Sequence, residues 1–253
     1  MTNKEIHEFL DTQVVRYNCR DFIVNDPISI PHNYSKKQDI EIAGLLAAVF
    51  SWGQRKTIIS KSTEFLNLMD DDPHDFVVNR TENDLKRFTS FVHRTFQPTD
   101  ALYFLEFFSL YYQKYNSMED LFLPNQSTES GLVNFHEQFF NHPSAPNRTR
   151  KHIPTPARKS SCKRINMFLR WMVRKDDRGV DFGIWKQIKP ANLLCPLDVH
   201  VGNVARKLGL LNRKQNDWLA TMELTKELQR FDPADPVKYD FALFGLGVSG
   251  VLR

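Results

Sequence analysis

Helical periodicity is the feature that most narrows the fold of this chain. Apolar residues recur every three or four positions through most of the 253 residues, whereas the strict alternation typical of strands is weak. The pattern predicts one unit over residues 1–253, all-α and arranged as two helical lobes. The predicted helices cover residues 39–51, 57–69, 100–115 (capped by Thr99), 132–140, 163–174, 181–188, 199–210, 217–231 and 237–248.

A proline-rich stretch interrupts this pattern between residues 141 and 160. Because proline is excluded from helix interiors, the stretch is predicted to be a loop or linker. It also opens a basic tract, since no acidic residue occurs between Glu137 and Asp176. Ordinary surfaces mix both signs of charge, so the tract favours contact with phosphate. A solvated basic surface is the alternative. The basic residues of the tract are Arg148, Arg150, Lys151, Arg158, Lys159, Lys163, Arg164, Arg170, Arg174 and Lys175.

Several classes of protein are disfavoured by what the sequence lacks. Three scattered cysteines suit a reducing cytosol and are too few to hold an iron–sulfur cluster. No run of 18 apolar residues is present, and the first residues form no apolar signal region. The residue spacings typical of metal ligands are also missing, so we expect neither a metal nor a cofactor. A cytoplasmic protein with no membrane contact is predicted.

Asp198 has an informative place in the sequence. It follows Pro196 and directly precedes the predicted basic amphipathic helix 199–210. Aspartate is among the best helix N-caps, so Asp198 has a simple structural interpretation. The same place, at the mouth of a basic helix, suits a carboxylate that acts on a DNA sugar. The two interpretations are compatible, because capping would keep the carboxylate aimed.

The segment around Asp198 resembles the helix-hairpin-helix (HhH-GPD) DNA glycosylases of base excision repair. Cys-Pro-Leu-Asp-Val-His-Val at 195–201 and Ala-Arg-Lys-Leu-Gly-Leu at 205–210 are similar to that superfamily's Pro-Val-Asp-Thr-His-Val and Arg-Leu-Gly-Leu segments. Residues 42–54 resemble its early helix, and residues 241–247 its closing helix. The chain also resembles a bacterial family of unassigned activity that carries Lys-Arg-x-Asn-Met-Phe-Leu-Arg-Trp-Met-Val-Arg, which stands here at 163–174.

The resemblance implies two catalytic residues. Lys163 occupies the place of the nucleophilic lysine, and its separation from Asp198 is similar to that in archaeal 8-oxoguanine DNA glycosylases. Cleavage of an N-glycosidic bond builds positive charge on the sugar, which a carboxylate stabilises. An amine can instead capture C1′ as a Schiff base and allow strand scission. Like charges on Arg158, Lys159 and Arg164 are expected to favour the neutral amine. A simple phosphate-contacting role is the alternative for Lys163.

The resemblance also implies residues that contact DNA. Gln54 matches the family's Gln or Asn that enters the space left by the flipped base, although it could equally be a polar turn residue beside a core Trp52. The hairpin within segment 156–209 lacks the family's glycines, so serine-flanked backbone N–H groups would have to bind the phosphate. The expected DNA contacts are Gln54, Arg55, Arg158, Lys159, Ser160, Ser161, Arg164, His200 and Arg206. Trp52, Trp185 and Phe241 are expected to line a base pocket, with core packing as the alternative for the two tryptophans.

These features predict a monomeric, nucleoid-associated DNA glycosylase with AP lyase activity. Its substrate would be double-stranded DNA with a damaged base, such as an oxidised one, and Lys163 and Asp198 would perform the chemistry. No residue specifies the lesion. One alternative is a non-catalytic DNA- or RNA-binding protein that retains the fold. The other is a helical protein-interaction module whose basic tract meets an acidic partner.

Overall fold

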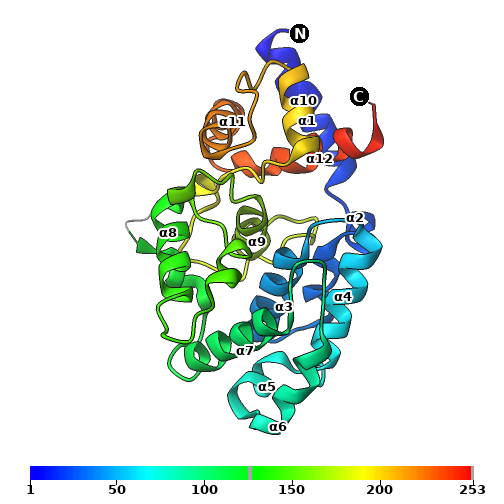
Figure 1. The fold of residues 1–253 in the computed structure, drawn as a ribbon. Helices are drawn as coiled ribbons and strands as arrows, with labels where there is room; N and C mark the ends of the chain where they lie inside the picture. The colour runs from blue at the N-terminus through cyan, green and yellow to red at the C-terminus, as the bar shows by residue number, and fades with distance from the viewer. Residues whose placement is uncertain (125–126, 252–253) are drawn as a thin grey trace.

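The computed structural model describes residues 1–124 and 127–251, and the regular structure in this part of the chain is helical (Figure 1). The predicted all-α class is therefore confirmed. The helices are α1 (Asn3–Tyr17), α2 (Arg20–Val24), α3 (Lys37–Phe50), α4 (Arg55–Asn67), α5 (Pro73–Asn79), α6 (Glu82–Leu85), α7 (Pro98–Tyr112), α8 (Thr128–Phe139), α9 (Lys163–Val173), α10 (Val199–Lys207), α11 (Trp218–Phe231) and α12 (Tyr239–Ser249). Within residues 1–124 and 127–251, no helix has the length and apolar composition needed to cross a membrane.

Eight of the nine predicted helices correspond to α3, α4 and α7–α12. The predicted helix over 181–188 is wrong. Its backbone turns back to the end of α9, where the N–H groups of Phe182 and Trp185 donate to the carbonyls of Trp171 and Met172. The cap predicted for α7 is also wrong, because Gln97 holds the N-cap position in place of Thr99, and its backbone N–H donates to the Asp100 side chain at 2.8 Å. Helix α1 was not predicted, and it buries only three of its residues.

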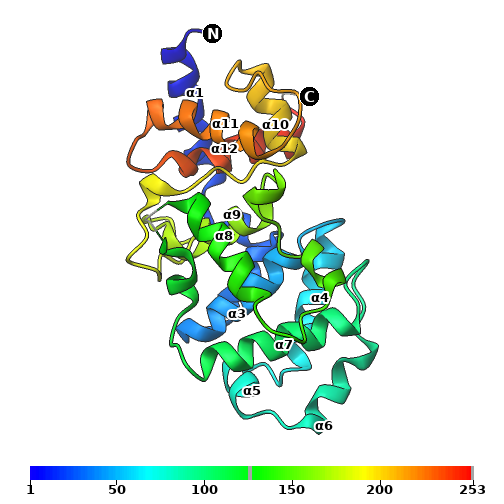
Figure 2. The same ribbon diagram turned by 60° about the vertical axis from the view of Figure 1, so that its left-hand side comes forward.

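Buried apolar side chains form two clusters. The larger surrounds α3 and α9 and includes side chains of α4, α5, α7 and α8. The smaller joins α1, α10, α11 and α12, which lie together at the top of Figures 1 and 2. Each large apolar side chain that is fully buried contributes about 1.5–3 kcal/mol to folding. The division into two lobes stays a prediction, but the clusters show where two separate sets of apolar contacts lie.

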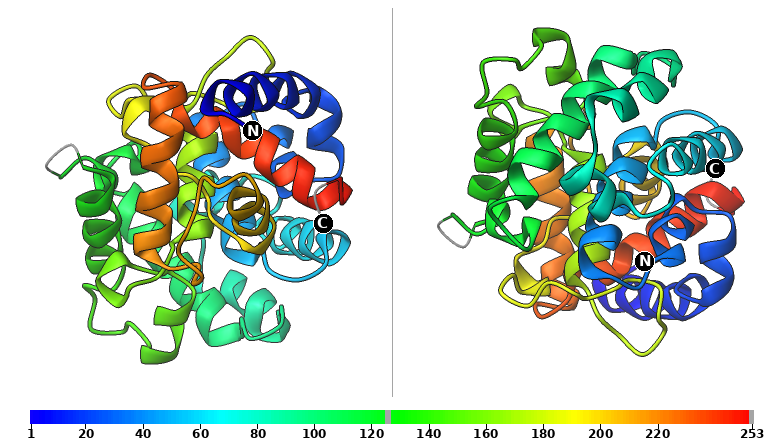
Figure 3. Two further views of the ribbon diagram at one scale, coloured as in Figure 1. Left: turned by 90° about the horizontal axis from the view of Figure 1, so that it is seen from above. Right: turned by 90° about the horizontal axis from the view of Figure 1, so that it is seen from below.

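Helix α12 lies between α1 and α10, as the view from above shows (Figure 3, left). Glycines allow this close approach. A Cβ atom on Gly245 would lie 2.3 Å from the ring of Tyr17. A Cβ atom on Gly247 would lie 2.8 Å from the Cβ of His200 and 3.0 Å from its carbonyl oxygen. Because His200 is in the first turn of α10, Gly247 fixes how closely the start of that helix approaches α12.

Residues 141–160 contain no α-helix, and their regular structure is two short 3₁₀ turns, η6 (Asn147–Lys151) and η7 (Pro156–Arg158). The loop is tied to α7, because the Thr149 hydroxyl donates to Asp100 of that helix at 2.7 Å. In place of the glycine hairpin, Lys159 and Cys162 adopt left-handed backbone conformations with φ of 59° and 51°. The carbonyl of Lys159 accepts the N–H of Trp218 at 3.1 Å, which joins this turn to the start of α11.

Candidate functional site

A cleft of about 790 Å³ receives side chains from both apolar clusters, including Met167 of the larger and Phe244 of the smaller. It is lined by the 3₁₀ turn η1 (Pro27–Ser29) and the residue before it, by the connection from α3 to α4, and by α9, the start of α10 and α12. A cleft of this size lies within the range of ordinary ligand pockets. Six predicted site residues lie along it, namely Trp52, Gln54, Arg55, Lys163, Asp198 and His200.

Lys163 and Asp198 face one another in this cleft. The amine Nζ of Lys163 lies 3.9 Å from Oδ2 of Asp198, and the two side chains are 25% and 21% exposed. Lys163 is the first residue of α9. Asp198 is the N-cap of α10, as predicted, because its Oδ1 accepts the N–H of Val201 at 2.9 Å. One carboxylate oxygen is therefore committed to the helix, while the other is directed at the amine.

The electrostatic setting of Lys163 differs from the expected one. Arg164 was predicted to contact DNA and to repel the Lys163 ammonium. Instead its guanidinium turns into the protein and donates to the carbonyls of Val49 and Lys151. Burial lowers the pKa of Arg164 to about 10. The group beside the Lys163 amine is the carboxylate of Asp198, so this neighbouring charge is negative rather than positive.

The floor of the cleft contains charged groups that the sequence analysis did not predict to lie there. Arg170 is buried and donates to Asp240 and, from Nε at 3.2 Å, to Asp181. Asp26 is buried and accepts the N–H of Ile28 at 3.1 Å. Burial raises the pKa of Asp26, and it raises that of Asp240 to about 6 because desolvation outweighs the attraction of Arg170. Arg170 and Asp240 are charged residues that stand among mostly apolar neighbours in the sequence. This pattern could have identified them as buried charges.

Aromatic side chains and arginines pair at the rim of the cleft. The guanidinium of Arg94 lies 4.6 Å from the ring centroid of Trp52, and that of Arg55 lies 5.0 Å from the centroid of Phe244. Gly53 has a φ of 112°, and a Cβ atom there would lie 2.6 Å from the guanidinium of Arg94. Gln54 is exposed and Trp52 is half-buried. Trp52 is therefore a rim residue, and its alternative interpretation as a core residue is wrong.

Other predicted residues do not join this cleft. Trp185 is buried in the larger cluster, where its indole N–H donates to Glu41 at 2.6 Å, so its predicted place in a base pocket is wrong and its core alternative holds. Phe241 is buried against the guanidinium of Arg170 and is not among the residues that line the cleft. Arg206 donates to the carbonyl of Arg213 and to the side chain of Asn216, which are structural contacts within the turn after α10.

The basic tract is less uniform in space than in sequence. Arg170 and Arg174 are buried in ion pairs with aspartates from elsewhere in the chain, and Arg164 binds backbone carbonyls. These three arginines are structural. Near the start of α9, Arg158 and Lys159 are exposed, and Ser160 and Ser161 are half-buried. For these four residues, contact with DNA stays a prediction.

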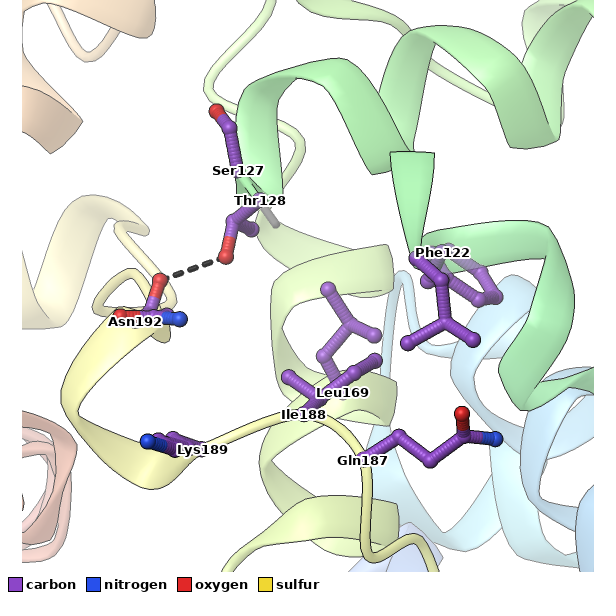
Figure 4. A pocket seen from close by; sticks show the side chains of 9 residues that line it. Phe122, Ser127, Thr128, Leu169, Gln187, Ile188, Lys189 and Asn192 are labelled. Carbon is purple, nitrogen blue, oxygen red and sulfur yellow. Dashed lines mark hydrogen bonds between the residues drawn. The ribbon is translucent and has the colours of Figure 1, made fainter. Parts of the chain in front are cut away.

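A second cavity, of about 330 Å³, lies between the start of α8, the middle of α9 and residues 187–192 (Figure 4). Its apolar side is formed by Phe122, Leu169 and Ile188, and the hydroxyl of Thr128 donates to the carbonyl of Asn192 at its edge. No predicted site residue lines it. In the described part of the chain, no group of three or more His, Cys, Asp or Glu side chains is arranged to hold a metal ion.

The chain belongs to the family described as "Protein of unknown function (DUF2400)", which matches residues 26–249. The matched region extends from the Asp26 wall of the cleft to the end of α12 and includes both Lys163 and Asp198. No curated protein and no solved structure matched the chain.

Proposed function

We propose that this protein is a DNA base-excision repair glycosylase with AP lyase activity. The observation that supports the proposal best is the pair formed by Lys163 and Asp198, which are 3.9 Å apart in a cleft of suitable size for an extruded nucleotide. An amine and a carboxylate are the two groups that this reaction requires, one as nucleophile and the other to stabilise charge on the sugar. The lesion would be a damaged base, with an oxidised base as the first candidate.

In the proposed reaction the damaged nucleotide leaves the base stack and enters the cleft. Positive charge develops on its sugar as the glycosidic bond breaks, and Oδ2 of Asp198 is in position to stabilise it. Asp198 is well oriented for this task, because its other oxygen is held by Val201 N–H. The amine of Lys163 then bonds to C1′ to form an imine, from which loss of a C2′ proton expels the 3′-phosphate and cuts the strand.

The partner in this proposal is duplex DNA, bound by one copy of the chain at the nucleoid. Exposed Arg158 and Lys159 would contact phosphates next to the start of α9. Arg55 and His200 line the cleft and would contact the strand that carries the lesion. Gln54, exposed at the rim, would occupy the space that the nucleotide leaves.

The test is borohydride trapping on duplexes that carry 8-oxoguanine, uracil, an alkylated base or an abasic site. We expect a covalent adduct on at least one duplex that is lost in Lys163→Gln and retained in Lys114→Gln, an exposed lysine that does not line the cleft. Asp198→Asn should reduce base release while preserving the helix cap, because asparagine caps helices as well as aspartate does. No adduct and no base release from any duplex would refute the proposal. Salt-sensitive binding unaffected by Asp198→Asn would indicate a non-catalytic nucleic-acid-binding protein.

A further inference from the structure

Two carboxylates of the cleft have different surroundings. Asp198 is 21% exposed and caps the N-terminus of α10. Asp240, in the first turn of α12, is only 5% exposed and contributes to the floor of the same cleft. The two carboxylates thus differ in exposure and in partners, and carboxylates in different environments suit different tasks in acid–base chemistry.

The groups that face Asp240 come from several elements. Arg170 of α9 donates a hydrogen bond to it, and Lys163 lies two turns earlier on the same face of that helix. Asp198 and the buried thiol of Cys195 approach from the segment before α10. Asp26 and Asp181 also face Arg170, and Asp181 is bound by Arg174 as well. Burial disfavours the charged form of Asp240, and this cost is relieved when the carboxylate takes up a proton.

We propose that Asp240 is the proton acceptor for Lys163. It would take a proton from the Lys163 ammonium through a water molecule in the cleft and return it as the imine forms. This inference rests on the proposed function and assigns a role within the same site. Asp198, whose Oδ1 is bound to the N–H of Val201, would keep its separate role of stabilising charge on the sugar.

The step balances without any further reactant. Proton transfer leaves a neutral amine on Lys163 and a protonated Asp240. The nitrogen lone pair then bonds to C1′ of the abasic-site aldehyde, and the carbonyl oxygen takes a proton from nitrogen to become a hydroxyl group. Asp240 protonates this hydroxyl, which leaves as water, and the nitrogen lone pair forms the protonated imine. The Asp240 carboxylate is restored.

The pKa of Asp240 supports this assignment. Burial raises it to about 6, which leaves the carboxylate ionised at neutral pH yet able to hold a proton transiently. A group with a pKa near the working pH is the most effective proton-transfer catalyst. The opposing alternative is that Asp240 only balances the charge of Arg170. Asp181 offers a matched control, because it binds the same arginine but does not line the cleft.

The experiment measures the rate of borohydride trapping on an abasic-site duplex between pH 5 and 8. The wild-type protein should show an inflection near pH 6, and Asp240→Asn should lose it and trap about 100-fold more slowly at pH 7. Asp181→Asn should keep the inflection. A wild-type rate and pH profile in Asp240→Asn would overturn the inference, and so would the same loss of the inflection in Asp181→Asn.

Two further outcomes are also decisive. If circular dichroism shows that Asp240→Asn does not fold, the test is the pH dependence of the wild-type trapping rate. The absence of an inflection near pH 6 in that rate overturns the inference. If the wild-type protein forms no adduct at any pH, the proposed lyase function fails, and the role of Asp240 fails with it. Trapping by the wild-type protein with an unchanged Asp240→Asn profile would refute the role of Asp240 alone.

Discussion

Asp198 combines a structural and a proposed chemical role, and two substitutions separate them. Asp198→Ala removes the acceptor that binds Val201 N–H at 2.9 Å, whereas Asp198→Asn retains an oxygen that can make that bond. Loss of an N-cap costs about 1 kcal/mol of folding free energy. The ion pair with Lys163, at 3.9 Å and partly exposed, contributes about 0–1 kcal/mol. We therefore expect Asp198→Ala to be less stable than Asp198→Asn by about 1 kcal/mol.

Thermal unfolding followed by circular dichroism provides the measurement. For a chain of this size, about 1 kcal/mol corresponds to a difference in Tm of roughly 2–4 °C. Asp217, which caps α11 through Ala220 N–H at 3.1 Å, is the matched control for a cap outside the cleft. Equal Tm values for Asp198→Ala and Asp198→Asn would refute the capping argument. If both variants lose base release while only Asp198→Ala loses stability, the charge is needed for chemistry and the oxygen for the fold.

Three further predictions follow from the geometry and the pKa shifts. Gly247→Ala should cost about 1–3 kcal/mol, because the added Cβ would lie 2.8 Å from His200; an unchanged Tm would show that α10 moves freely. The folded-state pKa of Asp240 is raised to about 6, so the stability that its proton contributes should decline between about pH 4 and 6, and Asp240→Asn should flatten this part of a Tm–pH curve. Asp217 has the opposite sign, because hydrogen bonding to Arg213 lowers its pKa to about 2. The stability that ionised Asp217 contributes should be present above about pH 4 and lost toward pH 2. A Tm–pH curve for Asp217→Asn that matches the wild-type curve below pH 4 would contradict this.

Features that depend on neighbouring residues were predictable from the sequence. The cap at Asp198 and the helices α3 and α9 follow from residue types within a few positions of one another. Long-range partners were not predictable. Trp185 is fixed by Glu41, 144 residues away, and Arg170 by Asp240, 70 residues away. Because an isolated sequence does not reveal such pairs, Trp185 was assigned to a pocket and Arg170 to a phosphate-binding tract.

The wrong prediction of a helix over 181–188 also results from contacts with another part of the chain. Its apolar spacing fits a helix, but its N–H groups bond to carbonyls at the end of α9, which lack partners within their own helix. The segment therefore completes the end of α9 as an irregular connection. Periodicity alone cannot separate these outcomes, because both bury the same side chains.

Arg170 connects the cleft to the stability of the whole molecule. It lies on α9, within the larger apolar cluster, and binds Asp240 on α12, whose apolar residues belong mostly to the smaller one. Removing one partner of a buried ion pair costs about 3–5 kcal/mol, because the other charge is left uncompensated. The floor of the cleft is thus also a link between the two clusters. A change at Arg170 would alter stability and site geometry together, so the proposed chemistry is better tested at Lys163, which is partly exposed and begins its helix.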